Sequence, residues 1–311
     1  MCNDGSPGAW YFHKASDPAM ANIWLVYLEG TSLVTRGATE ARACPASPTL
    51  ARACAWPRVR LTRVAPLCSG GDWCYSSQTC AQRYMVSPQF MSSNGWPGVI
   101  SLGGIMDESP AKSPWAGANK AYLGYCSSDA WVGDVPASPE TFNLAFRGQR
   151  IITAALQMLV TNHGMGSTPG ERLLFAGCSA GSRGAMFTAD YVGPMLEQMG
   201  VDLANIEIQA LFDSPMWVDV EPITGPDGVI VPLEVQTQAI LTLVGASNRL
   251  GVECANVYQG AEAWKCLYGQ YRLPYVQTPY AVNAAQFDKF QVRVPIFGGG
   301  KPQARRCACR P

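Results

Sequence analysis

The sequence has no net charge, almost no histidine and no long apolar run. Its 23 basic residues balance 23 acidic ones, which argues against a nucleic-acid or anionic-membrane partner. No uninterrupted run of about 18 apolar residues occurs, so we predict no transmembrane segment. Residues 1–5 lack the basic and apolar layout of a signal peptide, although other features below indicate secretion.

Metal ligands are also scarce. The two histidines are His13 and His163, and no Cys-x-x-Cys motif is present. Zinc sites combine such ligands at close spacing. We therefore predict neither a metal site nor a cofactor.

Cysteine, by contrast, is abundant, with 12 residues in the chain. Five residues separate Cys74 from Cys80, and eleven separate Cys254 from Cys266, both in loop-like sequence. We predict the local disulfides Cys74–Cys80 and Cys254–Cys266, and hence an oxidising compartment. The alternatives are reduced cysteines or a metal site, and the scarcity of histidine argues against the metal site. The sequence leaves the partners of three further cysteines open, namely Cys2, Cys126 and Cys178.

Strand-like and helix-like segments alternate along the 311 residues, of which 48% are hydrophobic. This order predicts an α/β fold with a mostly parallel sheet covered on both faces. The predicted strands are 22–30, 99–102, 119–126, 172–176, 205–212 and 279–285, and the predicted helices are 141–162, 182–199 and 233–248.

Ser179 lies at the centre of this pattern. A short apolar strand breaks at Gly177-Cys178-Ser179-Ala180-Gly181, and a helix follows. Strand, sharp turn and helix with a serine at the apex is the nucleophile elbow of α/β-hydrolases. Glycines two residues to either side leave room for close backbone approach. The alternative is an ordinary glycine-rich turn with a solvated serine.

The segment 31–70 differs from the rest of the chain. Residues 31–69 include six arginines and three cysteines but no Lys, Asn, Gln, Phe, Tyr, Met or Ile. No helical or strand period persists in it. A structureless loop of this length is unusual inside a compact domain.

Several motifs together resemble the pectin acetylesterase and Notum family of carboxylesterases. They lie at 4–7, 24–30, 71–74, 125–129, 146–148, 177–181, 262–267 and 270–275. The resemblance implies an α/β-hydrolase-like three-layer sandwich, secretion to the extracellular space or cell wall, and a Ser-Asp-His triad. Plant-type members of the family remove acetyl groups from pectin. Notum removes a fatty acyl group from a signalling protein.

The resemblance also implies that 31–70 is an insert. Family members read straight from Leu-Glu-Gly into a Gly-Trp-Cys segment, which here corresponds to joining Gly30 to Gly71. Our hypothesis is that the insert is translated non-coding sequence, and the alternative is a lineage-specific loop. We expect one domain over 1–297, interrupted by 31–70, and a basic tail over 298–311 outside the fold.

For the oxyanion hole, the elbow supplies the Ala180 N–H. By resemblance, backbone N–H groups of Gly71 and Asp72 complete it, although many relatives have a small or aromatic residue at the Asp72 position. Three tryptophans flank the catalytic motifs and are candidates for a substrate pocket, or else core residues: Trp73, Trp131 and Trp217.

Two acids are candidates for the triad, each after a predicted strand. The family motif favours Asp288, and Asp213 is the runner-up, with a role in lining the pocket otherwise. Asp213 could also be a simple turn or N-cap residue.

The triad histidine is absent from the sequence after Asp288. His163 precedes the elbow strand and is expected at the opposite end from Ser179, about 20 Å away. His13 precedes the first strand. Neither is a credible base, so we expect a C-terminally truncated chain that is inactive as written.

Three functions follow from these features. The first is a carboxylic-ester hydrolase of the pectin acetylesterase type, acting as a monomer on acetylated polysaccharide. The second is a non-catalytic relative that binds a glycan or acylated ligand. The third is an acyl-protein esterase resembling Notum.

Overall fold

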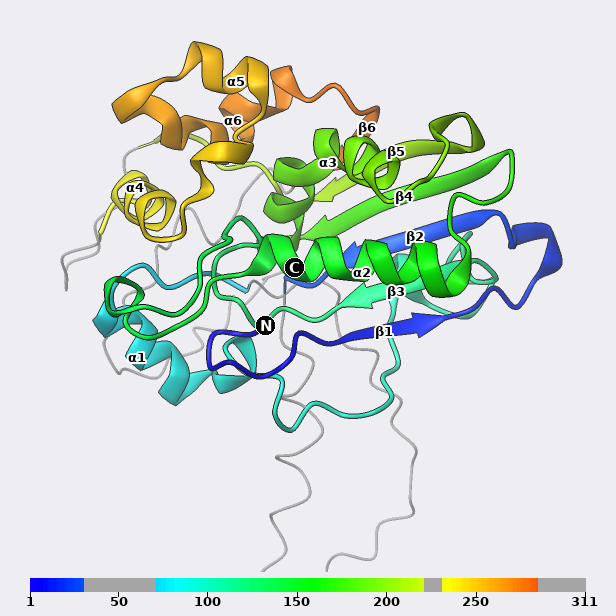
Figure 1. Cartoon of the computed structure of the whole chain (residues 1–311), viewed down its shortest axis with the longest axis horizontal. Helices are drawn as coiled ribbons and strands as arrows, with labels where there is room; N and C mark the ends of the chain where they lie inside the picture. The colour runs from blue at the N-terminus through cyan, green and yellow to red at the C-terminus, as the bar shows by residue number, and fades with distance from the viewer. Residues whose placement is uncertain (31–70, 221–230, 285–311) are drawn as a thin grey trace, which may run out of the picture.

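The computed structural model describes residues 1–30, 71–220 and 231–284. A six-stranded sheet with the order β1-β3-β2-β4-β5-β6 forms its centre (Figure 1). The edge strand β1 pairs antiparallel to β3, and the other neighbours are parallel. The strands are β1 Trp10–His13, β2 Ile23–Leu28, β3 Asn119–Leu123, β4 Glu171–Cys178, β5 Ile206–Asp213 and β6 Tyr280–Asn283. The predicted mostly parallel α/β sheet is confirmed.

Within the described residues, two long α-helices and four shorter ones accompany the sheet. They are α1 Ser77–Val86, α2 Gly148–His163, α3 Ala180–Gln198, α4 Leu233–Leu243, α5 Val252–Val257 and α6 Gly269–Arg272. In Figure 1, α1 and α4 to α6 lie on the side toward which the parallel strands point. None of the helices placed by the structure is long and apolar enough to cross a bilayer.

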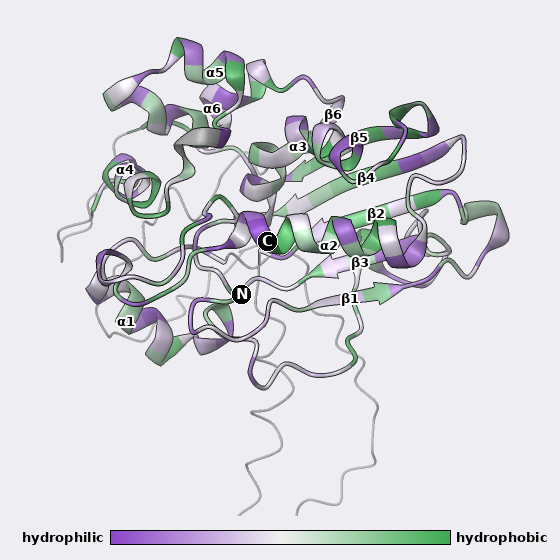
Figure 2. Ribbon diagram, viewed as in Figure 1, coloured by the Kyte–Doolittle hydropathy of each residue, from purple (hydrophilic) through white to green (hydrophobic). Residues whose placement is uncertain are grey.

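The two faces of the sheet are covered differently. The main core joins alternate β2 residues Trp24, Val26 and Leu28 to the apolar stripes of α2 and α3. A smaller cluster on the other face contains Leu25 and Tyr27. Alternation along a strand directs successive side chains to opposite faces, so β2 contributes to both clusters. Figure 2 shows the hydrophobic residues of the central strands and the mixed polarity of α2.

Two sequence predictions need correction, and one element was missed. Residues 99–102 form no strand: Leu102 alone makes an isolated bridge, and Ile100 and Leu102 pack against the smaller cluster. The helix predicted from residue 141 begins at Gly148, because left-handed backbone at Phe142 and Asn143 ends the preceding turn. Strand β1 was missed because its four residues, all half-buried, show no polar alternation.

The disulfides Cys74–Cys80 and Cys254–Cys266 are confirmed. A third disulfide, Cys2–Cys126, links the amino-terminal segment to the loop after β3 across 124 residues of sequence. Cys178 is also disulfide-bonded. The predicted insert 31–70 and tail 298–311 lie outside the described residues.

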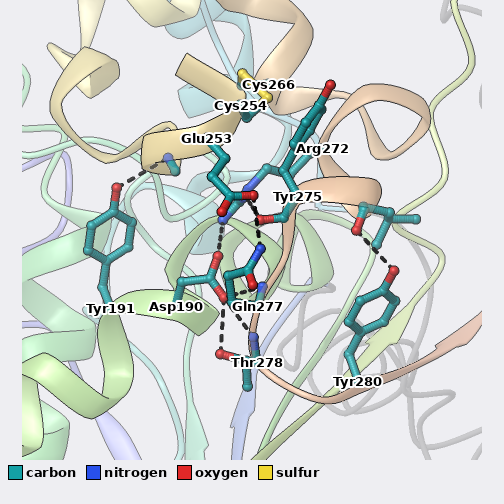
Figure 3. A network of polar contacts seen from close by, with 12 residues as sticks. Asp190, Tyr191, Glu253, Cys254, Cys266, Arg272, Tyr275, Gln277, Thr278 and Tyr280 are labelled. Carbon is teal, nitrogen blue, oxygen red and sulfur yellow. Dashed lines mark hydrogen bonds and ion pairs between the residues drawn. A yellow bond between two sulfur atoms is a disulfide. The ribbon is translucent and has the colours of Figure 1, made fainter. Parts of the chain in front are cut away.

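A polar network fastens the region of α5 and α6 onto α3 (Figure 3). Asp190 of α3 accepts a hydrogen bond from Arg272 Nη2 at 2.7 Å. Its other oxygen accepts the N–H groups of Gln277 and Thr278, each at 2.9 Å. Because these residues directly precede β6, Asp190 fixes where the last described strand joins the sheet.

Candidate active site

Ser179 occupies a strained turn between β4 and α3. Its φ is +55° and its ψ is −116°, a conformation that non-glycine residues rarely adopt and that concentrates at functional sites. The Ser179 N–H donates to the Asp213 carbonyl at 2.9 Å, and its own carbonyl accepts the Arg183 N–H at 3.0 Å. The residue is half-buried, so the backbone is fixed while the side chain keeps access to solvent.

The glycines around the elbow permit close backbone contacts. A Cβ on Gly177 would lie 2.3 Å from the Gly181 carbonyl oxygen, and one on Gly181 would lie 2.0 Å from that of Leu28. A Cβ on Gly30 would lie 1.7 Å from the Cys178 carbonyl oxygen. The missing side chain of Gly177 therefore leaves room for the first turn of α3. Gly181 and Gly30 let the end of β2 and the two residues after it approach the elbow.

The loop of Gly71 and Asp72 lies beside this turn, since a Cβ on Gly71 would lie 2.5 Å from the Gly30 carbonyl oxygen. Arg83 Nη2 donates to the Gly71 carbonyl. The Tyr125 hydroxyl donates to the Asp72 carbonyl at 2.8 Å. A trans peptide places its N–H opposite its carbonyl, so the bond from Arg83 to the Gly71 carbonyl turns the Asp72 N–H away from Arg83. The Tyr125 bond holds the next peptide of the loop. Such a fixed N–H suits an oxyanion donor.

Arg83 and Tyr125 were not among the sequence candidates, and their roles could not be read from a motif. Arg83 is 8% exposed and also donates to Ser128 Oγ at 2.8 Å. Tyr125 belongs to the 125–129 motif that carried part of the family resemblance, which was the available signal.

Asp213 lies next to the elbow, because β5 pairs with β4 so that Asp213 faces Cys178. Its Oδ1 accepts from Asn283 Nδ2 at 2.9 Å and from Ser214 Oγ at 3.3 Å. Burial raises the pKa of Asp213, and these two bonds oppose the rise. Asp288, the favoured acid, lies outside the described residues.

Both histidines lie far from Ser179. His13 ends β1, pairs with Lys120 in register, and approaches Glu108 at 3.3 Å. His163 ends α2, with its ring 4.0 Å from that of Phe12. His13 lies three strands away from β4 and is level with Leu174, five residues before Ser179. The strand spacing and the rise per residue then place His13 roughly 20 Å from Ser179. A general base must come within about 3 Å, so neither serves Ser179.

The three candidate tryptophans are all buried. Trp73 and Trp217 are 4% and 2% exposed and meet edge to face at 5.0 Å, with the Arg183 guanidinium carbon 3.1 Å from the Trp217 ring centre. Trp131 is completely buried, and its Nε1 donates to the Glu29 carbonyl at 2.9 Å. Trp131 is thus a core residue, and none of the three offers an open ring face for sugar stacking.

A second feature that the sequence did not predict is Asp129, which is completely buried. Its carboxylate accepts the N–H groups of Trp131 at 2.8 Å, Gly133 at 3.1 Å and Gly148 at 2.9 Å. Ser127 Oγ also donates to it at 2.6 Å. Asp129 therefore organises the loop after β3 and the start of α2.

The chain is similar in sequence and in fold to known proteins. The palmitoleoyl-protein carboxylesterase notum1' of Xenopus laevis is 28% identical over 295 residues, 94% of this chain and 50% of its own length. Pectin acetylesterase 11 of Arabidopsis thaliana is 24% identical over 297 residues, 94% of this chain and 60% of its own. The crystal structure of the Wnt deacylase Notum from Drosophila superposes with a TM-score of 0.74 at 28% identity, covering 94% of this chain and 70% of that one.

The sheet order and the match to Notum place the protein in the class of α/β-hydrolase-like folds. The model of the pectinacetylesterase family matches residues 67–307. The chain belongs to this family. It spans about half the length of the curated Notum relatives that it matches.

Proposed function

We propose that Ser179 is the nucleophile of a carboxylic-ester hydrolase that removes acetyl groups from polysaccharide. The strained backbone of Ser179 carries the proposal, and the approach of Gly71 to Gly30, and of Gly30 to Cys178 and the Ala180 nitrogen, supports it. A short acyl group is favoured because the loop of Gly71 and Asp72 carries the Asp72 carboxyl and continues into buried Trp73, which packs on Trp217. A long apolar chain gains little beside a buried carboxyl group.

In the proposed reaction, Ser179 Oγ attacks the ester carbonyl carbon while a base removes its proton. The carbonyl oxygen becomes an oxyanion that accepts from the Asp72 and Ala180 N–H groups. The carbon–oxygen bond to the alcohol then breaks, the alcohol takes a proton, and water later releases the acid from the acylated serine. Since neither histidine reaches Ser179, residues 1–311 lack the usual base for the first step.

We expect purified 1–311 to release no burst of p-nitrophenol from p-nitrophenyl acetate above a Ser179→Ala control. Added imidazole, a diffusible base, should produce release that exceeds the Ser179→Ala background at every imidazole concentration. A Ser179-dependent burst without imidazole would contradict the missing base. Equal release from both proteins with imidazole would contradict the nucleophile assignment and favour a non-catalytic ligand-binding role.

An acyl-protein esterase is the second candidate function, since the identity to notum1' exceeds that to the Arabidopsis pectin acetylesterase. The same assay with p-nitrophenyl octanoate separates the two. Faster Ser179-dependent release from the octanoate than from the acetate would favour the acyl-protein substrate.

A further inference from the structure

The loop of Gly71 and Asp72, which is proposed to supply an oxyanion donor, also carries the carboxyl group of Asp72. Asp72 has left-handed backbone with φ +45°, and its Oδ1 is buried without a hydrogen-bond partner in the part of the chain that the structure describes. An unpaired buried polar atom is costly and needs an explanation. The cost is greatest when the group is charged.

Covalent geometry fixes how close this carboxyl comes to the reaction. Within one residue the backbone nitrogen and the Cγ are at most about 4 Å apart. An oxyanion bound to the Asp72 N–H lies about 2.9 Å beyond that nitrogen. Whatever its rotamer, the carboxyl carbon therefore lies within about 7 Å of the developing negative charge.

We propose that Asp72 is a proton-controlled positioning residue, whose ionised carboxylate opposes the oxyanion and whose neutral form permits it. This inference rests on the proposed function of Ser179. At an effective dielectric constant of about 20, two like charges about 7 Å apart slow the reaction by roughly 50-fold.

Neighbouring groups reduce this effect. Arg83 from α1 and Arg183 from α3 face Asp72, together with the hydroxyl groups of Tyr75 and Tyr125. Burial raises the pKa of the Asp72 carboxyl, and Arg83, the Trp73 N–H and Arg183 oppose that rise. The two arginines offset part of the repulsion, so the expected net effect is about tenfold. For a given amount of deprotonated base, ester cleavage should then slow as pH rises through the pKa of Asp72, because the ionised carboxylate opposes the oxyanion.

The variant Asp72→Asn tests the inference, because asparagine is nearly isosteric and tolerates left-handed backbone. We would measure imidazole-dependent acylation by p-nitrophenyl acetate, minus the Ser179→Ala background, for Asp72→Asn and the wild type across pH. Dividing the Asp72→Asn rate by the wild-type rate at each pH cancels the titration of imidazole, because imidazole acts equally on both proteins. The ratio should be near one at acidic pH and rise to about tenfold above the Asp72 pKa. Glu207→Gln, which removes an exposed charge at the opposite end of β5, should keep a ratio near one throughout.

The outcomes separate the two proposals. A ratio that stays flat with pH, while acylation still depends on Ser179, overturns the role of Asp72 and leaves the nucleophile intact. If acylation is independent of Ser179 in both the wild type and Asp72→Asn, the proposed function is wrong, and so is the role of Asp72. Thermal unfolding supplies a readout without catalysis. The Tm of Asp72→Asn should rise relative to the wild type as pH increases through the Asp72 pKa, since only the wild type then buries a charge.

Discussion

Replacing Asp129 by alanine should destabilise the fold by at least about 4 kcal/mol, because each buried donor left unpaired costs about 1–3 kcal/mol. The N–H groups of Trp131, Gly133 and Gly148 and the hydroxyl of Ser127 all lose their acceptor. Water cannot readily replace it, since Asp129 is 0% exposed. Urea denaturation followed by tryptophan fluorescence measures the loss.

Asp129→Asn is the matched variant, since it keeps one acceptor oxygen but places an amide nitrogen against the remaining N–H donors. It should lie between the wild type and Asp129→Ala. Asp202→Asn is the external control, because Asp202 caps an exposed turn and bonds the Ala204 N–H at 2.9 Å. If Asp129→Ala and Asp202→Asn lose the same stability, Asp129 does not organise the loop.

The pH dependence of stability supplies a further test. Burial raises the pKa of Asp129 to about 6, against the opposing bonds from Ser127, Gly148, Trp131 and Gly133. A folded pKa above the unfolded value contributes stability that is present below about pH 4 and is lost as pH rises through about 6. The stability of the wild type relative to Asp129→Asn should therefore fall between about pH 4 and pH 7. A difference that is constant over this window would contradict the raised pKa.

Replacing Asp190 by alanine should cost about 3–5 kcal/mol, because it leaves a buried cation without its partner. Arg272 is completely buried, and Asp190 is the carboxylate that it bonds. The N–H groups of Gln277 and Thr278 lose their acceptor in the same substitution. Chemical denaturation gives the free energy, and hydrogen exchange should show faster exchange in β6, which these residues precede.

Glu253→Gln is the matched control, because Glu253 is exposed and bonds only the Gln277 side chain within the described network. It should change stability by less than about 0.5 kcal/mol. The double variant Asp190→Leu with Arg272→Met removes both charges and should be more stable than Asp190→Ala. Equal denaturation midpoints for Asp190→Ala and Glu253→Gln would show that the ion pair does not hold β6 in place.

The hydrophobic pattern and the spacing of special residues determined much of this protein. Short apolar runs and period-3.6 apolar stripes are local patterns, so they specified the parallel strands and the long helices before any packing was known. Glycines at fixed offsets from Ser179 specified the elbow, because a steric requirement within five residues is written directly in the sequence. The short spacings of Cys74–Cys80 and Cys254–Cys266 specified two disulfides for the same reason.

Tertiary structure alone decided the features that join distant segments. The acceptors of Arg83 lie 11, 12 and 45 residues away in sequence. Asp190 accepts the N–H groups of Gln277 and Thr278, which lie 87 and 88 residues away. A hydrogen bond between such segments depends on where the sheet places them, which no local period records. Burial is equally non-local: it made Trp131 a core residue and left the Asp72 carboxyl enclosed beside the elbow.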